Sequence, residues 1–235
     1  MSGDPVRLVS QCDSVPSLWK RMVRFCQGEG FRAGAYYLLG RSIPSPAMKP
    51  QSFGFPRAVQ QRYLSLDYRR LDVVPRVAIA KGSSVTWQEA WESATLTQEE
   101  REFWIAIQDQ IRGPGLGFPC YGPRGVFAYV ALAGFAKGRT FSDDYLHYLQ
   151  YVFQAGHLHL CSMLALGEKV PHLSIREKEV LTLVSVGKSN SVIGELLNIS
   201  ANTVDTHLRR IYNKMGVADR TSAAIKAVGG GIIPS

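Results

Sequence analysis

The chain has 235 residues and a mass of 26.0 kDa, which allows one large domain or two of ordinary size. Its composition, 46% hydrophobic and 20% charged, is that of a soluble globular protein. The longest apolar stretch, 125–136, is too short for a membrane-spanning helix. No signal peptide is predicted after Met1. The formal net charge of +8 favours an anionic partner such as nucleic acid, and we expect a cytoplasmic protein with no membrane partner.

The first half of the chain predicts an antiparallel sheet bordered by helices. The run 32–40 is a candidate strand that follows a helix and leads into a proline-rich loop at 41–51. A short strand is expected at 84–87, and a capping box at Thr97 and Glu100 begins a helix. Strands at 115–122 and 125–135 are joined by a Gly-Pro-Arg-Gly turn and are therefore antiparallel. This order predicts an α/β/α sandwich and argues against a receiver domain, whose strands are parallel.

A long helix is predicted at 142–166. Ser142 caps it, and its apolar side chains occur almost all round, so we expect burial on more than one side. A second copy of the chain would cover one of those sides. The segment 167–172 has glycine, proline and no periodicity, which predicts a linker. We therefore divide the chain into an N-terminal domain at 1–166, a linker at 167–172, and a C-terminal domain at 173–235.

Four short helices are predicted after the linker, the second and third joined by a tight turn. This is helix-turn-helix geometry, so the overall fold class is α+β with an all-α C-terminal bundle. The boundaries follow from the capping box of Ser174 and Glu177, the stop at Gly187, a cap at Ser189 or Asn190, the turn at 198–199, the cap at Ser200, and a last helix at 219–228.

The third of these helices has an apolar back and a donor-rich front. Its apolar residues recur at i, i+4, i+7 and i+11 from Val204 to Met215. Solvent is the ordinary neighbour of such a front, and the major groove of DNA is the functional alternative. The candidate DNA-binding residues are Lys188, Ser189, Asn202, Thr203, Thr206, Arg209, Arg210 and Lys214.

Residues 173–228 resemble the DNA-binding domain of LuxR-type transcription regulators along their whole length. The positions that fit include Glu177, Gly187, the Thr203-Val204 pair and His207. One departure is Val192, where the family usually has an acidic residue.

The stretch 53–76, with the segments at 84–87 and 115–125, looks like the autoinducer-binding domain of quorum-sensing LuxR proteins. The resemblance implies an N-acyl-homoserine lactone held between sheet and helices, with Asp72 accepting its amide N–H and Tyr63 donating to its acyl carbonyl. From the residues alone, Asp72 could instead pair with Arg69 or Arg70, and the aromatic residues could be plain core. The candidate ligand-binding residues are Phe55, Val59, Tyr63, Asp72, Val73, Trp87, Gly115 and Ala131.

Three of these positions depart from the family pattern. Val59 stands where the family places a tryptophan that donates to the lactone carbonyl, Val73 replaces a proline, and Ala131 replaces a serine or threonine. Two hypotheses follow. The protein binds a lactone with another group in place of the lost indole, or it is a receptor without a strict lactone preference, controlled by a different signal, by no ligand or by a protein partner.

The expected mechanism is stabilisation by the signal, homodimerisation and binding to an inverted repeat in double-stranded DNA, with RNA polymerase as a further candidate partner. An enzyme is a different class of function, less favoured than a DNA-binding module whose upstream domain only binds another protein. No G-x-S-x-G or H-E-x-x-H motif occurs, and the four cysteines and five histidines are scattered. We therefore predict no catalytic residues, no metal site and no cofactor, with free and mostly buried thiols.

Overall fold

The computed structural model describes residues 4–39, 50–64, 70–111, 113–136, 138–164 and 171–234. The chain divides into two compact units, one of residues 1–122 and 126–166 and one of residues 123–125 and 167–235. Most of the predicted loop at 41–51, Arg69, and residues 167–170 of the predicted linker lie outside the described residues.

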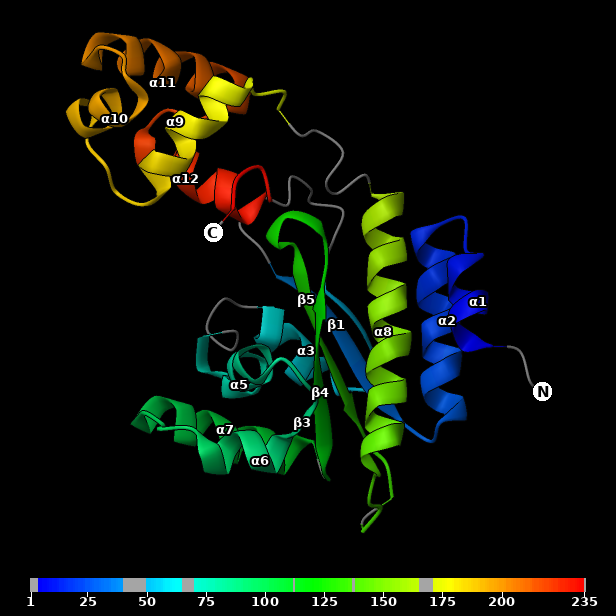
Figure 1. Ribbon diagram of the computed structural model, residues 1–235. Helices are drawn as coiled ribbons and strands as arrows, with labels where there is room; N and C mark the ends of the chain where they lie inside the picture. The colour runs from blue at the N-terminus through cyan, green and yellow to red at the C-terminus, as the bar shows by residue number, and fades with distance from the viewer. Residues whose placement is uncertain are drawn as a thin grey trace. The chain divides into compact units, whose positions relative to one another are not determined.

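The N-terminal unit is built on a five-stranded sheet in the order β2-β1-β5-β4-β3, with each neighbouring pair antiparallel (Figure 1). The central pair is in register along its whole length, with Tyr36 opposite Val130. The strands are β1 Ala33–Leu39, β2 Gln51–Phe53, β3 Val85–Thr86, β4 Gly115–Tyr121 and β5 Phe127–Ala133.

Helices cover both faces of the sheet, which confirms the predicted sandwich (Figure 1). Because successive strand residues point to opposite faces, β5 sends Val130 and Leu132 into one core and Tyr129 and Ala131 into the other. The helices of one face are α1 Pro5–Ser10, α2 Val15–Gly28 and α8 Asp143–Met163. Those of the other are α3 Arg57–Leu64, α5 Val73–Lys81, α6 Trp87–Ser93 and α7 Gln98–Gln110, and a 3-10 turn, η1, spans Pro123–Gly125.

The C-terminal unit has the predicted helix-turn-helix arrangement. Ser174 and Glu177 form the capping box, and Ser189 rather than Asn190 caps the second helix. Asn198 takes the left-handed conformation, with φ of 53°, and closes the tight turn. The helices are α9 Ile175–Ser185, α10 Asn190–Leu197, α11 Ala201–Met215 and α12 Arg220–Gly229.

The structure corrects one expected element. The strand predicted at 84–87 is only two residues long, and Trp87 opens α6 instead of ending a strand. The reason is a second capping box, in which Thr86 and Glu89 satisfy each other's backbone N–H groups.

The described cysteines are Cys12, Cys26, Cys120 and Cys161, all free and buried, as predicted. In the described ranges no cluster of His, Cys, Asp or Glu could hold a metal ion. Every helix in the described part of the chain is too short or too polar to cross a lipid bilayer.

Candidate ligand cavity and nucleic-acid interface

A cavity lies between the sheet and helices α3, α5, α6 and α7 in the N-terminal unit. It holds about 520 Å³ of space outside protein atoms, part of it open to solvent. We call it the signal cavity. Its lining residues are Ala35, Tyr37, Phe55, Val59, Gln60, Tyr63, Asp72, Val74, Trp87, Phe103, Trp104, Ile107, Ile111, Tyr129 and Ala131.

Six of the eight predicted ligand-binding residues line this cavity: Phe55, Val59, Tyr63, Asp72, Trp87 and Ala131. Val73 and Gly115 do not. Val73 is buried in the surrounding core. Gly115 makes room for an aromatic wall, because a Cβ at this position would lie 2.1 Å from the Trp87 ring.

The polar centre of the cavity is a hydrogen bond between Tyr63 and Asp72. The Tyr63 hydroxyl donates to Asp72 Oδ2 at 2.5 Å, and Oδ1 accepts the Val74 backbone N–H at 3.0 Å, so Asp72 also caps α5. These partners differ from the alternative pairing with Arg69 or Arg70. A carboxylate has about four lone-pair sites, so Asp72 keeps the capacity to accept a further donor.

The Asp72 carboxyl group is surrounded by protein, although the residue as a whole is only partly buried. Loss of hydration raises its pKa from 3.8 to about 6, against the opposing effect of the bonds from Tyr63 and Val74. Burial, and then the Asp72 charge, raise the pKa of Tyr63 well above 10. A ligand donor would offset the cost of holding the charged carboxylate in this environment.

Aromatic rings form much of the remaining wall. Tyr37 and Tyr63 lie 4.6 Å apart between ring centroids, and Trp104 stacks on Trp91 at 4.4 Å. Sequence reasoning missed Trp104 and Tyr129. The signal for Tyr129 was its place two residues before Ala131, which puts both side chains on one face of β5.

Val59 lies in the cavity wall, 4% exposed and without a side-chain donor. The adjacent Gln60 also lines the cavity, and its amide donates to the Phe55 carbonyl at 2.7 Å. An amide NH₂ has two protons, so Gln60 keeps a second one for another acceptor. Sequence reasoning did not single out Gln60.

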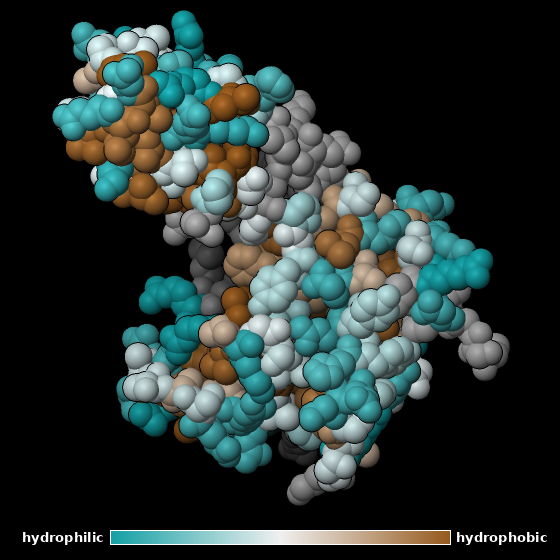
Figure 2. All heavy atoms as spheres, in the orientation of Figure 1, coloured by the Kyte–Doolittle hydropathy of each residue, from teal (hydrophilic) through white to brown (hydrophobic). Residues whose placement is uncertain are grey.

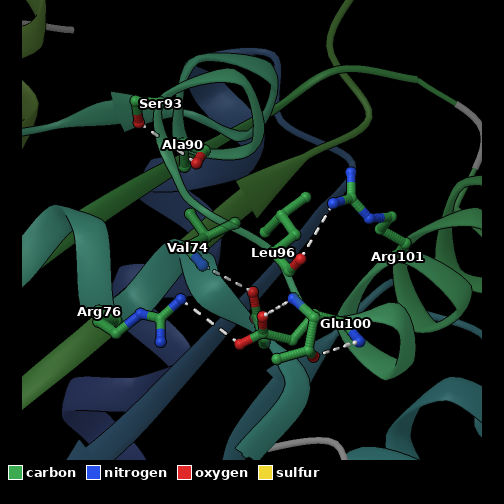
Figure 3. A network of polar contacts seen from close by, with 9 residues as sticks. Val74, Arg76, Ala90, Ser93, Leu96, Glu100 and Arg101 are labelled. Carbon is green, nitrogen blue, oxygen red and sulfur yellow. Dashed lines mark hydrogen bonds and ion pairs between the residues drawn. The ribbon is translucent and has the colours of Figure 1, made fainter.

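The helical wall is tied together behind the cavity. Figure 3 shows Arg76 of α5 reaching Glu100 of α7, with 3.4 Å between Arg76 Nη2 and Glu100 Oε1. Glu100 is 6% exposed and also accepts the Thr97 backbone N–H in a capping box. The Arg101 guanidinium donates to the Leu96 carbonyl at 3.1 Å (Figure 3). The Arg76–Glu100 pair links α5 to α7, and the other contacts fix the start of α7.

In the C-terminal unit, α11 presents the predicted donor-rich front. Val204, Leu208, Ile211 and Met215 are buried against the other helices, as the spacing predicted. The residues predicted nearest the groove and the two arginines are exposed: Asn202, Thr203, Thr206, Arg209 and Arg210. Apolar side chains are exposed on this unit as well, among them Val192 and Leu196 of α10 (Figure 2).

The other predicted DNA-binding residues have contacts within the unit. Lys214 pairs with Glu177 at 2.7 Å, and the Glu177 side chain is only 4% exposed. Ser189 caps α10, and the Lys188 carbonyl accepts from the Arg220 guanidinium. Arg209 pairs with Asp205 at 2.9 Å, but its side chain stays 78% exposed. Arg209 is therefore accessible to DNA, and Lys214, whose side chain is 42% exposed, also links α11 to α9.

Two known families match this chain. Residues 14–161 match the family described as "Autoinducer binding domain", and residues 171–227 match "Bacterial regulatory proteins, luxR family". The putative HTH-type transcriptional regulator y4qH of Sinorhizobium fredii is 34% identical over 182 residues, covering 76% of this chain and 55% of the relative. The transcriptional activator protein SolR of Ralstonia solanacearum is 24% identical over 206 residues, covering 84% of this chain and 85% of the relative. The chain thus matches about half the length of y4qH.

A solved structure shares the fold over nearly the whole chain. The crystal structure of Escherichia coli SdiA has a TM-score of 0.68 at 19% identity and covers 98% of this chain and 96% of its own. SdiA in complex with octanoyl-rac-glycerol has a TM-score of 0.64 at 19% identity, with coverages of 98% and 94%.

Proposed function

The chain belongs to the LuxR family of autoinducer-binding transcription regulators, and we propose that its signal is an N-acyl-homoserine lactone held in the signal cavity. Members of this family bind DNA and act without catalysis. The observation that carries the proposal is the Tyr63–Asp72 pair inside a cavity whose other lining residues, apart from Gln60, are aromatic and aliphatic. An amide-bearing lipid has the complementary chemistry, with one donor and one acceptor at the end of an apolar chain.

Binding would exchange one internal hydrogen bond for two with the ligand. The ligand's amide N–H would donate to Asp72, and the Tyr63 hydroxyl would turn from Asp72 to the acyl carbonyl. Asp72 thereby exchanges one donor for another, so its number of hydrogen bonds stays the same while the ligand's amide N–H and acyl carbonyl are both satisfied.

Gln60 is our candidate for the donor that Val59 lacks. Its second amide proton can reach a carbonyl group in the cavity without breaking the bond to Phe55. Gln60→Met keeps the length of the side chain and removes the donor. It should weaken a lactone and leave an acyl chain without the ring unaffected.

The second candidate function is a receptor without a lactone preference. Val59 favours it, because this wall of the cavity offers an apolar surface where a lactone carbonyl would lie. SdiA, which shares the fold, has been solved with octanoyl-rac-glycerol, a ligand with an acyl carbonyl and no amide. Control by a protein partner alone is a third possibility that the same experiment tests.

The experiment is thermal unfolding of protein made without any signal, with lactones of graded acyl length and with octanoylglycerol. A saturable rise in melting temperature for one lactone, absent in Asp72→Ala, supports the first proposal. At a free lactone concentration of about 100 times its dissociation constant, binding should raise the free energy of unfolding by about 2.7 kcal/mol. A rise with octanoylglycerol that survives in Asp72→Ala supports the second. A folded protein whose melting temperature does not change with either ligand points to control by a protein partner.

We further propose that the active form is a cytoplasmic homodimer on a palindromic promoter site, with the domain division at the linker 167–172. Tyr151 and Leu158 of α8 support dimerisation, because they are 63% and 48% exposed and seven residues apart, on one side of the helix. Two copies would place two α11 helices on two half-sites. Tyr151→Arg with Leu158→Glu should yield a monomer in sedimentation and abolish operator binding.

A further inference from the structure

A second cavity lies on the opposite face of the sheet, between α2, α8 and strands β1, β2 and β5. It holds about 610 Å³ of space outside protein atoms, part of it open to solvent. Gly34 of β1 and Gly156 of α8 border it; the Phe53 ring occupies the room beside Gly34, whereas a Cβ at Gly156 would meet only ordinary contacts. Its apolar lining includes Leu18, Trp19, Met22, Phe53, Phe153 and Leu160.

The polar feature of this cavity is a buried pair, Tyr36 and His157. Tyr36 Oη lies 2.6 Å from His157 Nδ1, and His157 is 1% exposed. Burial lowers the pKa of His157 to about 4, so the imidazole is neutral at pH 7 and carries one N–H. We assign this proton to Nε2, which lies 3.6 Å from Cys161 Sγ and has the Val126 backbone carbonyl as a possible acceptor.

The direction of the Tyr36 hydrogen bond follows from this arrangement. With the ring proton assigned to Nε2, Nδ1 is the acceptor and the Tyr36 hydroxyl donates to it. The hydroxyl has then used its only proton. Its oxygen keeps a free lone pair beside the cavity, which can accept a hydrogen bond from a ligand.

The lining excludes charged ligands. The polar residues that line the cavity are Tyr36, His157, Gln51 and the thiol Cys26, and none is charged at neutral pH. A carboxylate, phosphate or ammonium group here would lose its hydration without gaining a counter-charge, which is costly. An apolar wall with a free acceptor instead suits a neutral group that donates.

We propose that this cavity is a second ligand site, separate from the signal cavity, for a neutral single-chain amphiphile whose head group carries an O–H or N–H. Long-chain alcohols and primary amides belong to this class. The alkyl chain lies among the side chains of α2 and α8, and the head group donates to Tyr36 Oη. The site does not depend on the identity of the signal, because the sheet separates the two cavities.

Strand β1 supplies a matched control. Tyr36 and Tyr37 are neighbours whose side chains point to opposite faces, Tyr36 to this cavity and Tyr37 to the signal cavity. Removing the hydroxyl from either residue deletes the same atom. The fluorescence of Trp19 can report on binding in this cavity, because Trp19 lines it. The other tryptophans lie at the signal cavity: Trp87 and Trp104 line it, and Trp91 stacks on Trp104.

The experiment uses the full chain, with decanol, decyl methyl ether as a probe without a donor, and decanol carrying a terminal bromine as a fluorescence quencher. We expect decanol to bind saturably and more tightly than the ether. Tyr36→Phe should weaken decanol by about 3- to 10-fold, the range of one hydrogen bond, and Tyr37→Phe should not. The brominated alcohol should quench the tryptophan fluorescence of the wild-type protein, and this quenching should be lost in Trp19→Phe.

Gly156→Leu keeps the test decisive if Tyr36→Phe unfolds. A Cβ at 156 meets only ordinary contacts, with Met22 Sδ at 3.5 Å, and leucine is a better helix former than glycine. This variant should fold and lose decanol binding. The proposal is overturned if decanol does not saturate, if the ether binds equally well, if Trp19→Phe leaves the quenching intact, or if only Tyr37→Phe weakens binding. A failed lactone response leaves all of these readouts in place.

Discussion

Replacing Asp72 with asparagine should stabilise the unliganded protein at neutral pH. The asparagine oxygen can accept from Val74 as Asp72 Oδ1 does, and its NH₂ can donate to the Tyr63 oxygen, so the second contact is kept with donor and acceptor exchanged. What disappears is the cost of a charged carboxylate inside the protein. The same substitution should reduce the response to a lactone, because the acceptor for the amide N–H is lost.

The magnitude follows from the pKa of Asp72. The carboxyl group ionises near 3.8 when free and near 6 in the folded protein, a difference equivalent to about 3 kcal/mol at 1.36 kcal/mol per pKa unit. Because the residue is partly exposed, solvent screens part of this, and we expect about 1–3 kcal/mol. Proton binding to Asp72 stabilises the fold fully below pH 4, and this stabilisation is lost as the pH rises through 6.

The assay is urea unfolding of wild type and Asp72→Asn between pH 4 and 7. The difference in unfolding free energy should grow in favour of the variant as the pH rises, since all other groups titrate alike in both proteins. Tyr63→Phe is the opposing control: it removes a hydrogen bond that lowers the pKa of Asp72, so the loss of stability with pH should become steeper. A difference that stays flat from pH 4 to 7 would refute the desolvation argument.

Three further predictions concern single residues of both units. Val59→Trp should strengthen lactone binding by roughly 0.5–1.5 kcal/mol, the contribution of one hydrogen bond, as measured by calorimetry. An unchanged binding free energy would mean that the lactone carbonyl lies elsewhere. Arg209→Ala should cost about 1–3 kcal/mol in operator binding if Arg209 contacts a base, whereas equal weakening on all DNA sequences in a gel-shift assay would make it a phosphate contact. Lys214→Met should lower the free energy of unfolding by roughly 1–3 kcal/mol, because it leaves the buried Glu177 without its cation. This loss of stability should shrink at acid pH, since Lys214 lowers the pKa of Glu177. An unchanged melting temperature at pH 7 would contradict this role.

Local signals predicted most of the secondary structure because they act over three or four residues. The capping boxes at Thr97 and Ser174 began helices where expected, and the turn after 122 joined two antiparallel strands. The same kind of signal was missed at Thr86 and Glu89, where β-branched residues before Trp87 suggested a strand. The competing capping box decided that segment in favour of a helix.

The roles of charged residues on the surface were harder to predict. Lys214 belongs to the donor-rich side of α11 by spacing, but Glu177 lies 37 residues earlier in the chain and reaches it only through packing of α9 against α11. Helical periodicity describes one helix at a time and does not show which neighbour covers its flank.

The sequence by itself determined the fold class, the family, the helix-turn-helix unit and the alternation of β1 and β5 between two faces, since each depends on residues near one another in the chain or on a long matched pattern. The tertiary structure decided which side chains share a cavity. It brought Tyr63 against Asp72, removed Val73 and Gly115 from the cavity wall, and set Tyr36 on His157 across 121 positions. Such pairs depend on how helices pack on a sheet, and the pKa of Asp72 depends on the burial that this packing produces.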